Sequence, residues 1–163
     1  MANVLQPAPD FRAPAVWGRG DVRELLLSEY RGKWVVLFFY PLDFTAVCPT
    51  EILEFSKRAG EFEALGGQVV GCSTDSQHSH RAWIQKDLGE LHIPLVADLT
   101  KRIARDYGAL LEDRGFATRA TFIIDPQGIL QASSELPTPC TLAGLSPAPC
   151  LCLRVLLPPC LRI

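Results

Sequence analysis

An apolar run that leads through a short polar loop into a helical pattern constrains the fold of this chain most. Residues Trp34 to Tyr40 form an unbroken apolar run rich in Val and Phe, the pattern of a strand buried on both faces of a sheet. From Thr50 to Leu65, apolar side chains recur at helical spacing. They are Ile52, Phe55, Ala59 and Phe62. The chain therefore passes from a buried strand to a helix between Tyr40 and Thr50.

The rest of the chain alternates predicted strands with predicted helices. This alternation favours a layered α/β domain with a mixed, partly parallel sheet and flanking helices, and a thioredoxin-like fold fits the order. Further strands are predicted at 68–73, 93–97, 118–124 and 129–132, and further helices from 75 or 76 to about 87 and from 98 or 100 to about 107.

The composition changes after Ala132. At 163 residues the chain has the length of one domain, and residues 1–132 hold the predicted α/β core. Residues 133–163 contain six of the 13 prolines and four of the six cysteines, and after Glu135 only Arg154 and Arg162 are charged. Because proline at this density prevents a regular helix or central strand, residues 133–163 are expected to form an irregular, divergent tail rich in Pro and Cys.

Charge and hydropathy argue against several classes of partner. The net charge of −2 gives no electrostatic basis for binding nucleic acid or an anionic membrane. No apolar run reaches the length of a membrane helix, and Met1 to Pro7 lacks the basic and apolar regions of a signal peptide. Six cysteines without such a signal favour reduced thiols, and a cytoplasmic location is expected.

Cys48 lies where the buried strand is followed by the helix. Free backbone N–H groups and the positive end of the helix dipole meet at such a position, and both favour a thiolate over a thiol. Thr45 places a hydroxyl three residues earlier, and Pro41 and Pro49 stiffen the loop on either side. A cysteine beside an apolar strand is usually a small core residue. A core residue needs none of these neighbours, so they favour sulfur chemistry.

The segment Phe38 to Glu51, FFYPLDFTAVCPTE, resembles the signature of the peroxiredoxins, specifically of the typical two-Cys subgroup. The resemblance covers most of the chain up to about Leu130. It continues through Gly71 to Ser76, His80 to Trp83, Ile93 to Asp98 and Arg119 to Asp125. A match of this length is specific, and it implies the thioredoxin-like fold.

The resemblance also implies a thiol-dependent peroxidase that reduces hydrogen peroxide and organic hydroperoxides. Cys48 is then the peroxidatic nucleophile, which cycles through a sulfenic acid. Four other residues have implied roles: Thr45 hydrogen-bonds the thiolate and the peroxide, Pro41 shields the sulfur from water, Arg119 stabilises the developing charge, and Glu51 orients the arginine. Taken without the motif, Arg119 is an ordinary surface strand residue and Glu51 an ordinary acid in a first helical turn.

The same resemblance implies partners and excludes cofactors. The reductant would be thioredoxin or a small thiol, and no metal, haem or flavin is implied. The expected assembly is a homodimer, or a heterodimer with related peroxiredoxins.

The resemblance ends before the part of the family that carries the resolving cysteine. Typical two-Cys members continue with a last core strand, a long helix and an arm with a Val-Cys-Pro motif, and none of these is recognisable here. The family's second arginine has no clear match either. The first resolving candidate is Cys140, the nearest tail cysteine to the core; the others are Cys150, Cys152 and Cys160.

This departure leaves two alternative functions open. One is a catalytically impaired splice or frame variant that acts as a thiol sensor or as a binding partner of intact peroxiredoxins. The other is a general thiol–disulfide oxidoreductase on the same fold, which the absence of a Cys-x-x-Cys pair disfavours.

Four further residues are expected to have no chemical role. Cys72 lies in a buried strand pattern and is expected to be an inert core thiol, and Trp83 is expected to pack in the core or at an interface. His78 and His80 are two residues apart and so do not share a helix face. A metal pair is therefore not expected, and both histidines are expected to face solvent.

Overall fold

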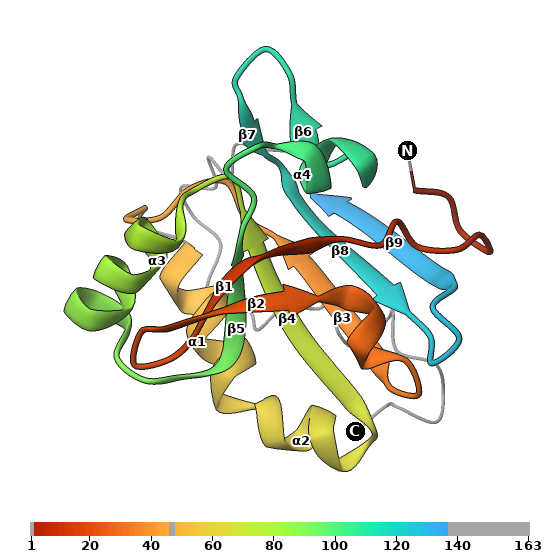
Figure 1. The fold of residues 1–163 in the computed structure, drawn as a ribbon, viewed down its shortest axis with the longest axis horizontal. Helices are drawn as coiled ribbons and strands as arrows, with labels where there is room; N and C mark the ends of the chain where they lie inside the picture. Colours follow the sequence, from red (N-terminus) through yellow and green to blue (C-terminus); the bar gives the residue numbers. More distant parts are fainter. Residues whose placement is uncertain (1, 46–47, 137–163) are drawn as a thin grey trace, which may run out of the picture.

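The computed structural model describes residues 2–45 and 48–136, which build a seven-stranded sheet with helices packed on both faces (Figure 1). The strand order is β2-β1-β5-β4-β3-β8-β9. The parallel strands are β3 (Trp34–Phe39), β4 (Gly67–Ser73) and β5 (Leu91–Ala97), and the antiparallel ones are β1 (Arg12–Gly18), β2 (Asp21–Leu26), β8 (Arg119–Ile124) and β9 (Leu130–Leu136). The mixed sheet confirms the predicted fold class.

Short helices connect the strands. They are α1 (Cys48–Lys57), α2 (Ala59–Ala64), α3 (Gln77–Trp83) and α4 (Arg102–Asp106), with a 3-10 turn η1 (Leu27–Tyr30), a π-helical turn η2 (Ile84–Leu88) and a small hairpin of β6 (Leu110–Leu111) and β7 (Phe116–Ala117).

Strand β3 is buried on both faces, as its apolar run predicts. Alternate side chains along a strand point to opposite faces of the sheet, and the two sets join two separate clusters. Val36, Phe38 and Tyr40 pack with Cys48 and apolar residues of α1, α2 and α3. Val35, Leu37 and Phe39 pack with Ile103 and Tyr107 at α4. Tyr40, the residue after β3, therefore lies in the layer that also holds Cys48.

The predicted helix over 50–65 is two helices in the structure. It breaks at Arg58, two residues before Gly60, which has low helix propensity. The helix predicted to end near Asp87 starts at Gln77, with the Ser76 hydroxyl accepting from the Ser79 N–H, and becomes π-helical after Trp83.

The hairpin of β1 and β2 is a feature that sequence patterning missed. Its register runs from Arg12 opposite Leu26 to Trp17 opposite Asp21. Strand β2 lies at the sheet edge with most of its side chains exposed, so it lacks the apolar alternation of a half-buried strand. Pro14 further weakens the strand signal of β1.

The described residues end inside the predicted tail. Strand β9 continues to Leu136, past the predicted end at 132. The rest of the tail, with Cys140, Cys150, Cys152 and Cys160, lies outside the described residues, so the boundary at 132 and the irregular tail stay predictions. Among the helices of the described ranges, none has the length and apolarity needed to cross a bilayer.

Candidate active site at the start of helix α1

Cys48 is the first residue of α1 and its side chain is buried, with 1% of the residue exposed. It packs in the cluster that includes Tyr40, Ile52 and Trp83, and it is a free thiol. The positive end of a helix dipole lies at such a position, a setting that favours a thiolate. The structure therefore places Cys48 where the strand-to-helix pattern predicts it, at the start of a helix.

Arg119 approaches the sulfur from the neighbouring strand. It is the first residue of β8, whose next residue, Ala120, pairs with Phe39 at the end of β3. This register brings the guanidinium to the end of β3 where Cys48 lies. Its Nη2 donates to Cys48 Sγ at 3.1 Å, and the side chain is only 14% exposed. A cation at this distance stabilises a thiolate electrostatically.

Glu51 holds the other end of the same guanidinium. It lies three residues after Cys48, on the same side of the first turn of α1, and its Oε2 accepts from Arg119 Nη1 at 2.7 Å. Burial raises the pKa of Glu51, and the charge and hydrogen bond of Arg119 oppose that rise. Arg119 thus bridges a carboxyl group and the sulfur, which fixes the direction of its positive charge.

Pro41 and Thr45 belong to the loop that precedes Cys48. Pro41 is half-buried. The Thr45 hydroxyl donates to the Leu42 carbonyl at 3.1 Å, within the loop itself. The hydrogen bonds from Thr45 to the thiolate and to a peroxide, which the resemblance implies, stay predictions.

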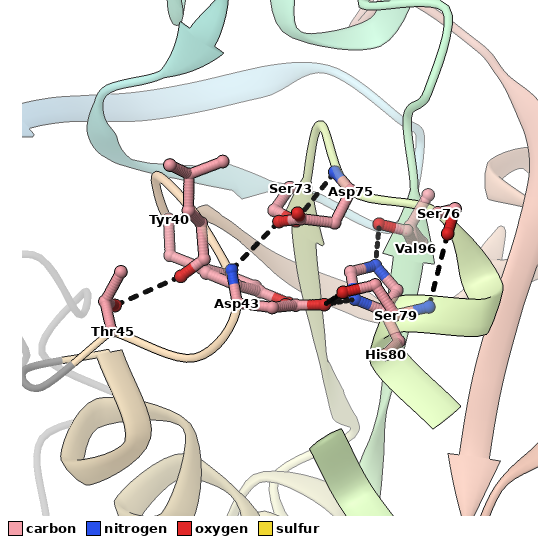
Figure 2. Close-up of polar contacts among 10 residues, drawn as sticks. Tyr40, Asp43, Thr45, Ser73, Asp75, Ser76, Ser79, His80 and Val96 are labelled. Carbon is pink, nitrogen blue, oxygen red and sulfur yellow. Dashed lines mark hydrogen bonds and ion pairs between the residues drawn. The ribbon is translucent and has the colours of Figure 1, made fainter. Parts of the chain in front are cut away.

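The loop is held by a buried polar network that sequence reasoning missed (Figure 2). Asp43 accepts hydrogen bonds from the hydroxyls of Tyr40 and Ser79, and its Oδ2 is hydrogen-bonded to His80 Nδ1. His80 is wholly buried, so its expected exposure is wrong, whereas His78 is exposed as expected. His80 lies three residues before the buried Trp83, on the same face of α3. That spacing to a predicted core residue was the signal that could have placed it inside.

The other cysteine in the described ranges, Cys72, lies in β4 with no exposed surface. Burial, and more weakly the charge of Asp98, raise its pKa well above the ordinary value. Cys72 is therefore buried as predicted and is held as a thiol. Within residues 2–45 and 48–136, no three His, Cys, Asp or Glu side chains gather in a way that could hold a metal ion.

Comparisons with known proteins agree with this geometry. Residues 4–133 match the model of the AhpC/TSA family. The chain is 55% identical over 135 residues to peroxiredoxin-2 of Pongo abelii, covering 80% of this chain and 76% of that one. It is 53% identical over 135 residues to peroxiredoxin-1 of Gallus gallus, covering 80% and 68%. The reduced 2-Cys peroxiredoxin of Plasmodium vivax superposes with a TM-score of 0.77 at 38% identity, covering 82% of this chain and 85% of that one.

Proposed function

The chain belongs to the AhpC/TSA family as a peroxiredoxin, a thiol-dependent peroxidase, and we propose that Cys48 is the residue that reacts with the peroxide. The observation that carries this proposal is the single guanidinium of Arg119, which contacts both Cys48 Sγ and the Glu51 carboxyl group. A buried thiol that only fills the core is not expected to have a buried arginine directed at its sulfur.

The proposed reaction is a displacement at oxygen. The Cys48 thiolate attacks one peroxide oxygen, an S–O bond forms, and the O–O bond breaks. The sulfur is oxidised to a sulfenic acid, and the peroxide is reduced to water or an alcohol once the leaving oxygen takes up a proton. Arg119 stabilises the thiolate first and the negative charge that moves onto the departing oxygen next.

Pro41 and Thr45 complete the proposed site. We assign to Pro41 the exclusion of water from the sulfur, which its half-buried place in the loop supports. We assign to Thr45 a hydroxyl that orients the peroxide. Its donation to Leu42 leaves the oxygen free to accept a second hydrogen bond, because a hydroxyl has two lone pairs. Hydrogen peroxide and small organic hydroperoxides are the proposed substrates.

Turnover needs a resolving thiol and a reductant. The sulfenic acid condenses with the resolving thiol, releasing water and forming a disulfide; two thiols of the reductant then reduce that disulfide to two thiols and themselves become a disulfide. We propose thioredoxin or a small thiol as the reductant and Cys140 as the first candidate for the resolving thiol, in a homodimer or in a heterodimer with related peroxiredoxins. A cytoplasmic location, where thiols stay reduced, fits this cycle.

The decisive test of the function compares two cysteine variants. Cys48→Ser should abolish rapid consumption of hydrogen peroxide in stopped-flow measurements, because it removes the nucleophile. Cys72→Ala is the matched control, since it removes a buried thiol from the other core cluster; it should keep the parent rate. Rapid consumption by Cys48→Ser would refute the assignment of Cys48.

A further inference from the structure

Asp43 and His80 form a buried pair beside the loop that precedes Cys48. His80 Nδ1 lies 2.8 Å from Asp43 Oδ2, and the two side chains are 0% and 1% exposed. Asp43 comes from the loop, whereas His80 comes from α3, which follows two helices and a strand further along the chain (Figure 2). A pair this deeply buried must have its protons and charges matched by its neighbours.

The neighbours determine where the protons lie. His80 Nε2 faces the Val96 carbonyl oxygen at 3.1 Å, and because a carbonyl only accepts, Nε2 carries a proton. Asp43 accepts from the Ser79 hydroxyl at 2.7 Å and from the Tyr40 hydroxyl at 3.0 Å. One proton therefore lies between His80 Nδ1 and Asp43 Oδ2, and this hydrogen bond joins the ring to the loop.

The titratable groups around this ring are few. Asp43 faces Nδ1 from the loop, and the Tyr40 hydroxyl, at the end of β3, lies 3.4 Å from the same nitrogen. Strand β5 contributes only the Val96 carbonyl. Asp75 follows β4 and contacts the Asp43 backbone rather than the ring. Among the residues that the structure describes, Asp43 is the carboxyl group that contacts the ring.

The pair fixes the loop from two sides. The Asp43 side chain binds α3 through Ser79 and His80. Its backbone N–H donates to Asp75 Oδ2 at 2.9 Å, and Asp75 is itself held by the Ser73 hydroxyl at 2.8 Å. The next residue, Phe44, has a left-handed φ of 56°, a conformation that costs free energy for a non-glycine residue and persists only where neighbours enforce it. The loop between Pro41 and Thr45 is thus held in one shape.

We propose that His80 is a positioning residue for the peroxide reaction. Through its hydrogen bond with Asp43 it holds the loop of Pro41 and Thr45 in place beside Cys48, without touching the reacting atoms itself. This inference rests on the proposed function of Cys48. Its physical basis is that displacement at oxygen requires the peroxide and the sulfur in a defined geometry, and small displacements of the orienting groups lower the rate steeply.

Two reactions of the same sulfur separate positioning from a general loss of structure. Oxidation by peroxide needs the oriented loop, whereas alkylation by iodoacetamide needs only the thiolate. In His80→Gln and in Asp43→Asn, oxidation of Cys48 should slow by about tenfold or more, while alkylation should stay within about twofold of the parent. Tyr107→Phe is the control. It removes a buried hydroxyl that donates to the Pro9 carbonyl at 2.9 Å in the other core cluster, and it should leave both rates unchanged.

A spectroscopic measurement on the parent protein checks the hydrogen bond directly. Proton and nitrogen-15 spectra should show a downfield, slowly exchanging proton between His80 Nδ1 and Asp43, assigned by its loss in His80→Gln or, if that variant does not fold, in His80→Asn. A His80 Nδ1 without this hydrogen bond would overturn the proposal.

The reaction rates can also overturn the proposal that His80 positions the loop. One contradicting result is oxidation of folded His80→Gln or Asp43→Asn at the parent rate. Another is an equal fall in the rates of oxidation and alkylation, which would mean that the thiolate is lost rather than that the loop is displaced. If neither variant folds, the ring spectrum of the parent decides. A slow reaction of the parent itself, together with an intact hydrogen bond between His80 and Asp43, would instead refute the function proposed for Cys48.

Discussion

Arg119 is the residue on which the chemistry of Cys48 depends most. Without the motif it reads as a surface strand residue, yet its side chain is largely buried and contacts the sulfur. The reason is register, because pairing of Ala120 with Phe39 places residue 119 at the end of β3 where Cys48 lies. The residue types of the site are readable in the sequence, but the contact between Arg119 and Cys48, 71 residues apart, depends on the assembled sheet.

Replacing Arg119 with Met should slow oxidation of Cys48 by about 100-fold, because the variant lacks the cation that stabilises the thiolate and the departing oxygen. Stopped-flow measurements with excess hydrogen peroxide at pH 7 check this fall. Arg105→Met removes an exposed arginine paired with Glu112 and should keep the parent rate. The parent rate in Arg119→Met would show that Arg119 has no role in the reaction.

At the scale of elements, what the sequence predicts depends on how strongly each element is buried. Strand β3 carries an unbroken apolar run and is found where predicted, and the helical pattern after it is found as two helices, α1 and α2, in place of the one predicted. Strands β1 and β2 were missed because an exposed edge strand has no apolar alternation. His80 was misjudged for a related reason. A histidine in a helix is ordinarily exposed, and only the assembled structure supplies Asp43 and Val96 as partners for both ring nitrogens.

Two glycines test how tightly the elements pack. A methyl group added at Gly71 of β4 would lie 2.8 Å from atoms of both Leu95 and Phe38, so Gly71→Ala should lower the free energy of unfolding by about 1–3 kcal/mol. Gly60 of α2 has open space around it. Gly60→Ala should therefore raise the free energy of unfolding by about 0.5–1 kcal/mol through better helix propensity. Urea unfolding measures both, and equal effects of the two substitutions would contradict the packing described for β4.

At the scale of the whole molecule, the sheet is covered on both faces and several titratable groups lie within the covering layers. Tyr40 and Tyr107 are buried among aromatic neighbours, and Cys72 lies in β4. Burial raises the pKa of all three above the ordinary values. The folded state therefore keeps these groups protonated at a pH where the unfolded chain ionises them.

The stability that these three groups contribute falls as the pH rises. A group with a raised pKa in the folded state contributes stability that is fully present below its ordinary pKa and is lost at higher pH. The ordinary pKa is 9.0 for Cys72 and 10.0 for Tyr40 and Tyr107. The free energy of unfolding should fall above about pH 9, by up to about 1.4 kcal/mol per pH unit for each such group. Urea unfolding at pH 7, 9 and 10.5 measures this fall, and Cys72→Ala should make it shallower. Constant stability over that range would contradict the burial of these groups.

The most direct test of the account is to find where one equivalent of hydrogen peroxide puts its oxygen. The protein is treated for less than a second in the presence of a reagent that traps sulfenic acids, and the modified cysteine is then identified by mass spectrometry of its peptides. The account predicts the trapped sulfenic acid on Cys48, with Cys72 unmodified. Trapping first at Cys72 or at a cysteine of the tail, with Cys48 still reduced, would contradict it.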